Sequence, residues 1–138
     1  MYVPPPFAEA DELCSEILDF LLDCGGIYQE KSAYLTTEVL ISIANGQYVI
    51  ERDEAGNITL YMCYWKITPD EVEQVADKTW PGSRSIGNVI YVVECGNKTG
   101  RNGLLRAATT IRRNNPTLQG CFWHNNSEVK QFTKQKGV

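Results

Sequence analysis

The sequence predicts a single α/β domain in which a central mixed sheet is flanked by helices. Within residues 89–123, a run rich in valine, isoleucine and tyrosine (89–95) is followed by glycines, a helical segment (104–114) and a second apolar run (118–123). Apolar runs of this length are typical of strands that are covered on both faces. Pro116 ends the helix, because proline lacks an amide donor and the residue before it avoids the helical region. One helix between two strands within about 35 residues has the size of a βαβ unit, so the two strands are expected to be parallel neighbours.

The composition is that of an ordinary folded protein. The 138 residues are enough for one domain with a substantial core, and we expect that domain to span residues 1–138. Hydrophobic residues make up 43% and charged residues 22%, which argues against wholesale disorder. No apolar run approaches the roughly 18 residues of a membrane span, and no basic leader marks a signal peptide. The five cysteines are odd in number and form no C-x-x-C pair, so we expect a reduced, cytoplasmic protein without a metal site.

Charge is distributed unevenly along the chain. Residues 98–138 carry eight basic side chains and one acidic side chain, a balance of +7, whereas residues 1–97 carry five basic and 16 acidic side chains, a balance of −11. The basic segment includes the glycines before the helix, which favours an anionic ligand there and argues against nucleic-acid binding over the whole surface. Solvated helix faces whose charges happen to segregate would give the same pattern, so both interpretations stay open.

The first half of the chain predicts two helices followed by an antiparallel hairpin. The expected bounds are 8–24 and 36–45 for the helices, and 47–52 and 57–65 for the strands. The leader over residues 1–6 holds three prolines and is expected to be extended. Gly46 is the expected stop of the second helix. The second strand is apolar on both sides, so it should be central in the sheet.

Two further helices complete the expected set. Thr68-Pro69-Asp70-Glu71 is a good helix start, because threonine caps, proline suits the first position and glutamate reaches back to the cap. That helix is expected to reach about Ala76, and residues 79–88 are expected to form a loop. After the βαβ unit, Asn125-Asn126-Ser127 is expected to cap a last helix that runs to about Lys136.

This order of elements resembles the GCN5-related N-acetyltransferase (GNAT) superfamily, over residues 35–138. In that family a signature strand after an antiparallel meander leads into a phosphate-cradling loop, a helix, a parallel strand and a final helix. The motif N-x-x-A-x-x-x-Y-x-x-x-G-F of the family is similar to the closing stretch Asn126-x-x-Val129-x-x-x-Thr133-x-x-x-Gly137-Val138. The resemblance implies a GNAT-like acyl-CoA N-acyltransferase fold, C-terminally truncated before the hairpin that usually completes the acceptor pocket.

The middle of the chain resembles one branch of that family, the RTX toxin-activating lysine acyltransferases. Their pattern Q-Y-x-x-x-R-D-x-x-G-x-x-x-Y-x-x-W is approximated by Gln47-Tyr48, Arg52-Asp53, Gly56, Tyr61 and Trp65. The final segment is also similar to small acetyltransferase-like proteins of tailed phages, some of them virion components. Two functions are therefore expected: an acyl-CoA-dependent N-acyltransferase acting on an amine, or a non-catalytic GNAT-fold protein such as a phage virion component or partner-binding protein. The first would act in the cytoplasm and the second in the host cytoplasm or the virion.

The resemblance implies a site for acetyl-CoA or acyl-CoA at the glycines before the helix. In the family, backbone amides of a Q/R-x-x-G-x-G/A loop hold the pyrophosphate; here the loop lacks the leading Gln or Arg and the last small residue, since Asn97 and Asn102 stand there. The segment still offers amides, glycines and cations to an anion, and a purely structural turn is the alternative. The backbones of Val92 and Val93 would align the pantetheine arm. The remaining expected contacts are Gly96, Lys98, Thr99, Gly100, Arg101, Asn102, Gly103 and Asn126.

Glu94 and His124 are the candidate catalytic bases. Glu94 lies within the signature strand, where a carboxylate could take a proton from an amine. His124 is the only histidine and titrates in a suitable range, although a hydrogen-bonded histidine at a strand end is the interpretation we favour. The tyrosine that serves the family as general acid falls on Thr133, which cannot donate a proton at neutral pH. Cys95 is expected to be a core residue.

The missing hairpin implies a sheet edge left open near the C-terminus. An open edge presents unpaired backbone groups, so a protein partner or a second copy of the chain would be expected to cover it. Neither a nucleic acid nor a membrane is expected as a partner.

Overall fold

The computed structural model describes residues 2–76, 84–118, 120–125 and 128–132, the last two segments as backbone. The helical elements are α1 (Phe7–Cys24), α2 (Ala33–Asn45), a 3-10 turn η1 (Pro69–Glu71), α3 (Val72–Ala76) and α4 (Gly100–Asn114). The strands are β1 (Tyr48–Arg52), β2 (Ile58–Ile67), β3 (Val89–Asn97), β4 (Gly120–Asn125) and β5 (Glu128–Phe132).

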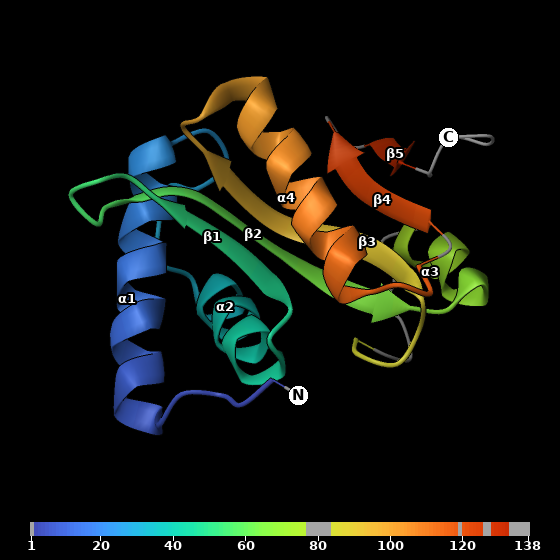
Figure 1. Cartoon of the computed structure of the whole chain (residues 1–138), viewed down its shortest axis with the longest axis horizontal. Helices are drawn as coiled ribbons and strands as arrows, with labels where there is room; N and C mark the ends of the chain where they lie inside the picture. The colour runs from blue at the N-terminus through green and yellow to red at the C-terminus, as the bar shows by residue number, and fades with distance from the viewer. Residues whose placement is uncertain (1, 77–83, 119, 126–127, 133–138) are drawn as a thin grey trace.

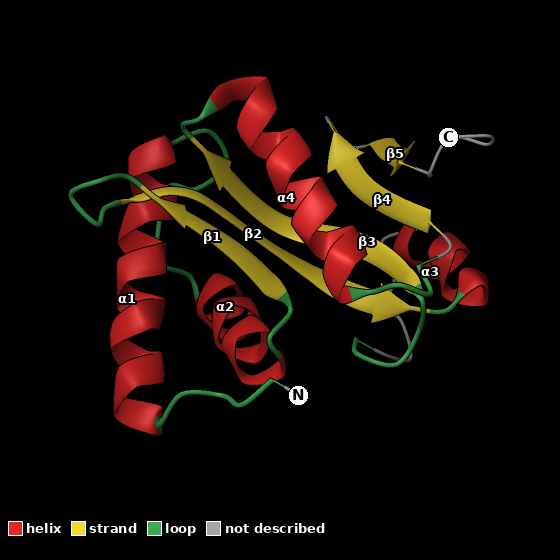
Figure 2. Ribbon diagram, in the orientation of Figure 1, coloured by secondary structure: helices red, strands yellow, loops and turns green. Residues whose placement is uncertain are grey.

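The strands form one mixed sheet in the order β1-β2-β3-β4-β5 (Figure 2). β1, β2 and β3 are antiparallel neighbours, β3 and β4 are parallel, and β4 and β5 are antiparallel. The predicted class, a mixed sheet flanked by helices, is therefore confirmed. The predicted parallel pairing across the βαβ unit is also confirmed, because Val89 pairs with Gly120 and Val92 with Trp123.

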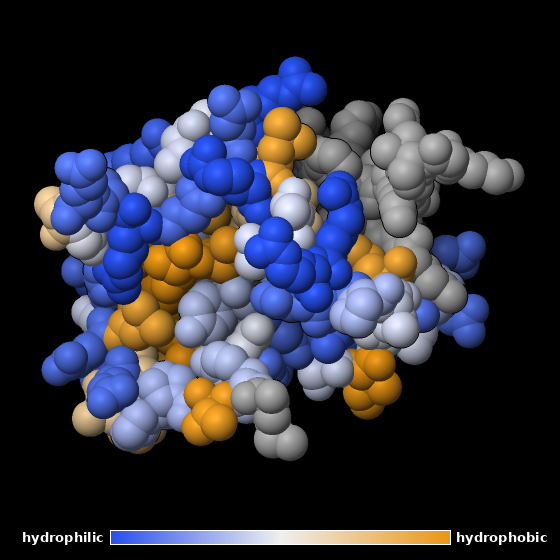
Figure 3. All heavy atoms as spheres, in the orientation of Figure 1, coloured by the Kyte–Doolittle hydropathy of each residue, from blue (hydrophilic) through white to orange (hydrophobic). Residues whose placement is uncertain are grey.

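Two separate cores cover the two faces of the sheet. On one face α1 and α2 pack on β2, and the buried contacts include Ile17, Val39 and Tyr61. On the other face Ala107 and Ile111 of α4 pack against apolar residues of β1, β2 and β3 (Figure 1). β2 is buried along nearly its whole length, as expected for a central strand. Mainly hydrophilic side chains cover the outer surface of α4 (Figure 3).

The second helix ends where the sequence predicts but begins three residues earlier. The amide of Leu35 donates to the Ser32 side chain at 3.1 Å, so α2 begins at Ala33 rather than at Thr36. The helix ends at Gly46, whose φ of +68° is left-handed. A side chain at Gly46 would also overlap the ring of Tyr2. The leader therefore lies against the end of α2.

The predicted capping box before α3 is confirmed. The amide of Thr68 donates to Glu71 Oε1 at 2.8 Å, and the amide of Glu71 donates to the backbone oxygen of Thr68. The first turn is a tight 3-10 turn, and the α-helix follows from Val72.

The predicted last helix is wrong. Residues 128–132 form a strand, and β5 runs antiparallel to β4 with Asn125 opposite Glu128. A strand left with one neighbour exposes a row of backbone donors and acceptors, and the hairpin pairs them. The segment also has only Val129 and Phe132 as apolar residues, too few for a helical stripe. The edge expected to be open at the last predicted strand is therefore covered, and the outer strands of the described sheet are β1 and β5. Residues 133–138, including Thr133, lie outside the described residues.

Candidate functional site

The parallel strands β3 and β4 pair over only part of their length. Their last pair joins Val92 to Trp123, while β3 continues to Asn97 alongside β2. At the same point β3 has a bulge, because Cys63 and Tyr64 of β2 pair with Glu94 and Val92 and leave Val93 between them. Bulges are frequent beside functional sites, where they change the direction of a side chain.

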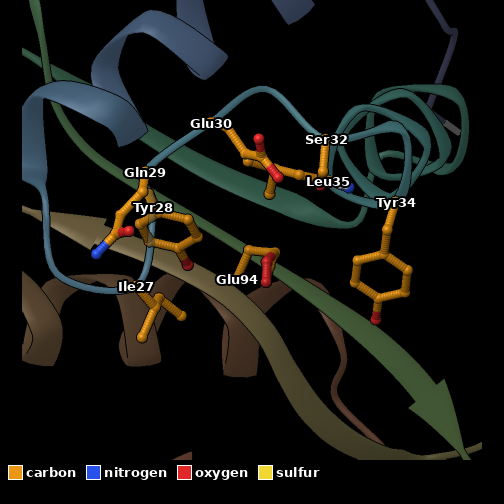
Figure 4. A pocket seen from close by; sticks show the side chains of 8 residues that line it. All are labelled: Ile27, Tyr28, Gln29, Glu30, Ser32, Tyr34, Leu35 and Glu94. Atoms are coloured by element: carbon orange, nitrogen blue, oxygen red, sulfur yellow. Dashed lines mark hydrogen bonds between the residues drawn. The ribbon is translucent and has the colours of Figure 1, made fainter.

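A pocket lies next to this bulge, on the face of the sheet that carries α1 and α2. Its volume is about 570 Å³, and it is formed by the loop between the two helices, the start of α2 and one residue of β3. In Figure 4 the Glu94 side chain lies between those of Tyr28 and Tyr34, with the loop that carries Glu30 above it. The full set of lining residues is Ile27, Tyr28, Gln29, Glu30, Ser32, Tyr34, Leu35 and Glu94.

Glu94 is a buried carboxyl group on the wall of this pocket. The residue is 8% exposed, and its Oε2 has no hydrogen-bond partner among the described residues. Burial, with a smaller contribution from the Glu38 carboxylate, raises the pKa of Glu94 to about 7. Near neutral pH the group is therefore divided between its acid and its carboxylate, the condition that suits a general base.

Glu38 is fixed in the interior beside Glu94. Trp65 Nε1 donates to Glu38 Oε2 at 2.9 Å, and the Arg84 guanidinium forms an ion pair with Oε1 at 3.0 Å. The same guanidinium lies over the Trp65 ring, 5.5 Å from its centroid. Glu38 is 2% exposed, so this pairing offsets the desolvation of its charge.

Tyr28 fastens the pocket loop to β3. The amide of Cys95 donates to the Tyr28 hydroxyl at 2.9 Å, so this amide is not available to a partner strand. Burial, reinforced by the Glu94 charge, raises the pKa of Tyr28 well above its usual value. Burial likewise raises the pKa of Tyr34 to about 12. Both hydroxyls therefore stay protonated at neutral pH.

The expected glycine loop is much shorter than predicted. Gly96 and Asn97 belong to β3, and α4 begins at Gly100 rather than at Leu104, which leaves Lys98 and Thr99 as the connection. Asn97 Oδ1 accepts from the Thr99 amide at 2.8 Å, and Asn97 Nδ2 donates to the Gly100 carbonyl at 2.9 Å. These local bonds and the φ of +74° at Gly100 start the helix early.

Two of the glycines are needed for packing inside the chain. A Cβ at Gly103 would lie 1.5 Å from Thr99 Oγ1, and a Cβ at Gly96 would lie 2.7 Å from Leu21 Cδ2. At Gly100 a Cβ would meet nothing within 4 Å. Of the expected cradle, only the segment around Gly100 is therefore open to a ligand.

The expected cations of the cradle differ in their surroundings. Lys98 forms an ion pair with Asp23 of α1, and its ammonium lies over the Phe20 ring. Arg101 and Asn102 are exposed in the first turn of α4. That turn contains no acidic residue, and Thr99 makes no side-chain cap to its amides. An anion is compatible with this helix start.

The remaining candidates are placed as follows. Val92 is buried and Val93 is half-buried at the bulge. The backbone of His124 pairs with Val129 in β5, while its side chain and Asn126 lie outside the described residues, so no contact with Glu94 is described. Burial raises the pKa of Cys95 to about 11, in agreement with a core thiol rather than a nucleophile.

The described residues contain neither a metal-ligand cluster nor a helix suited to cross a membrane. No group of three or more His, Cys, Asp or Glu side chains is arranged to hold an ion in this part of the chain. None of its helices combines the length and the apolar character of a membrane span.

Sequence reasoning found Glu94 but missed the residues that build the pocket around it. Tyr28 and Cys95 are 67 positions apart, and no local pattern links them. Tyr28, the second residue after the Gly25-Gly26 stop, carried no signal beyond being an aromatic residue near a helix end. No protein-family model matches the chain, and no curated protein matches it either.

Proposed function

We propose that the protein is an acyl-CoA-dependent N-acyltransferase in which Glu94 accepts the proton of an amine. One observation carries the proposal: a buried carboxyl group lines a pocket directly after a bulge in β3, and one of its oxygens has no hydrogen-bond partner among the described residues. The pKa of about 7 lets this group accept a proton near neutral pH. The order of elements, which resembles the GNAT superfamily up to β4, supports the same activity.

In this proposal the chain binds the amine, orients it and removes its proton. The nitrogen would bond to an acyl carbon as the carbon–sulfur bond of the thioester breaks, and the proton would pass from nitrogen to Glu94. Acyl-CoA would supply the thioester, and coenzyme A would leave as a thiolate that then takes the proton back from Glu94, so that the carboxylate is restored. Tyr28 and Tyr34 would limit the amine to positions beside Glu94, because their rings flank its carboxyl group (Figure 4).

In this proposal, residues outside the pocket would bind the acyl-CoA co-substrate. The backbone at Val93 would align the pantetheine arm, since β4 no longer pairs with β3 beyond Val92. The amides that begin α4 and the exposed Arg101 would hold the pyrophosphate. Lys98 would join them by leaving Asp23, because an exposed ion pair is weak.

A non-catalytic relative, such as a phage virion component or partner-binding protein, is the second candidate function. The observation that favours it is the two-residue connection between β3 and α4, in which Gly96 and Gly103 are packed against the chain's own side chains. On this alternative the pocket beside Glu94 would bind a partner rather than a reacting amine.

Calorimetric titration with coenzyme A and acetyl-CoA tests the two candidates. If the protein is catalytic, both compounds are expected to bind in the micromolar to millimolar range. They should bind the R101A variant more weakly than the unmodified chain. E94Q should keep this affinity and lose transfer of the acetyl group to an amine. An absence of coenzyme A binding at millimolar concentration would reject the catalytic function and leave the second candidate.

A further inference from the structure

Two carboxyl groups, one buried and one exposed, give the pocket beside Glu94 its negative charge. Glu94 lies at its buried wall and is 8% exposed, whereas Glu30 is exposed on the loop above it (Figure 4). Neither lysine nor arginine is among the lining residues in the part of the chain that the structure describes. Lys31, the neighbour of Glu30 in the sequence, forms its ion pair with Asp19 of α1 instead. A ligand with one positive charge near each of these two carboxyl groups would complement this arrangement.

Aromatic and apolar side chains line the pocket that holds the two carboxyl groups. Tyr28 and Tyr34 stand on either side of Glu94, and Ile27 and Leu35 add apolar surface to the lining. Aromatic faces attract an ammonium group and also cover methylene groups. The Tyr28 ring is held by its hydroxyl on the Cys95 amide, so the wall is preorganised.

The unpartnered oxygen of Glu94 indicates which group reaches the base of the pocket. An ammonium group offers up to three donors to an acceptor that has no partner among the described residues. A ligand without a donor would leave this oxygen unsatisfied, and an anionic ligand would be repelled by the carboxylate.

We propose that the amine acceptor is an unbranched diamine, with one terminal ammonium group at Glu94 and the other at Glu30. The proposal rests on the acyltransferase function above and narrows its substrate from any amine to a dication of this shape. Glu94 would take the proton from the reacting nitrogen, while Glu30 would hold the distant ammonium group and fix the depth of the chain.

Binding of matched amines to the whole protein tests the proposal. Putrescine and cadaverine are compared with butylamine and pentylamine by calorimetry at low salt. Each diamine should bind about threefold to fivefold more tightly than its monoamine, the range of an exposed charge pair. The advantage should shrink as salt is added, because Glu30 is exposed.

Two variants with equal net charge separate the local effect of Glu30 from general electrostatics. E30Q should reduce diamine binding to the level of the monoamine and leave the monoamine unchanged. E54Q, in the exposed turn between β1 and β2, should leave both affinities as they were. Equal binding of diamine and monoamine, or equal effects of the two variants, would overturn the diamine proposal while the acyltransferase function stands. Coenzyme A affinity, measured on the same sample, reports on that function separately; failure of every amine to bind removes the acceptor site and both proposals with it.

Discussion

Glu94 and Glu38 are buried neighbours, and only Glu38 has a cationic partner in the described part of the chain. Arg84 and Trp65 hold the Glu38 carboxylate, while one oxygen of Glu94 has no donor among the described residues. The Glu38 charge therefore adds to the effect of burial on Glu94 and helps to raise its pKa to about 7. The paired Glu38 carboxylate thus contributes to the condition that lets Glu94 exchange a proton near neutral pH.

The first prediction concerns stability against pH. Because the pKa of Glu94 is raised in the folded state, the folded protein binds more protons than the unfolded chain, and stability falls as pH rises from about 4.5 to about 7. E94Q should lack this loss and exceed the unmodified protein by about 2 to 3 kcal/mol above pH 7. Urea unfolding between about pH 5 and about pH 8 measures the difference.

Three titratable side chains around Glu94 do not contribute to that measurement. Burial raises the pKa of Tyr34 and Cys63 to about 12, and the pKa of Tyr28 is raised as well, so all three stay neutral in this range. E54Q serves as the control, and its profile should follow that of the unmodified protein. Parallel profiles for E94Q and E54Q would show that Glu94 ionises like a solvated carboxyl group.

The second prediction concerns the coupling of the two carboxyl groups. E38Q removes the charge beside Glu94 and keeps the shape of the side chain, so the pKa of Glu94 should fall toward its usual range. Carbon-13 NMR of the Glu94 carboxyl group measures this directly. E38Q should also lower stability, because it leaves Arg84 without its carboxylate. An unchanged Glu94 pKa would mean that burial alone sets it.

Sequence reasoning succeeded where a structure depends on neighbours in the chain. The capping box at Thr68 and Glu71, the left-handed stop at Gly46 and the βαβ unit all follow from local chemistry. The early start of α4 was missed because it depends on the Asn97 side chain, which bonds to both Thr99 and Gly100. The sequence shows that Asn97 can form hydrogen bonds, but it does not show which groups its side chain contacts.

The candidate site, too, could be predicted from the sequence only in part. Glu94 could be named from its place in an apolar strand, whereas its pocket depends on a loop that precedes it by more than sixty positions, as the Tyr28–Cys95 bond shows. The strand β5 was missed for a related reason. Its five residues are stabilised by pairing with β4, and a short segment carries no periodic signal of its own.

The third prediction compares two glycines in the first turn of α4. A Cβ at Gly103 would overlap Thr99, whereas one at Gly100 would meet nothing and only suffer its positive φ. G103A should therefore destabilise the protein by about 1 to 3 kcal/mol, and G100A by about 1 kcal/mol. Urea unfolding ranks the two variants. Adding T99G to G103A should restore part of the loss; no restoration would mean that the strain lies elsewhere.

The last prediction concerns the ion pair between Lys98 and Asp23, which lies beside the proposed pyrophosphate site. K98A and D23N break the same pair, so a purely structural role predicts similar effects of both on the protein. Coenzyme A binding should separate them. K98A removes a cation that would hold the phosphates, while D23N frees that cation from its competitor and removes a repulsive charge. We expect K98A to weaken coenzyme A binding and D23N to strengthen it, each by about twofold to fivefold at low salt and less at high salt. Calorimetry at two salt concentrations gives both affinities. If the variants shift binding in the same direction, Lys98 acts only through its bond to α1, and the pyrophosphate site would have to rely on Arg101 and the helix amides alone.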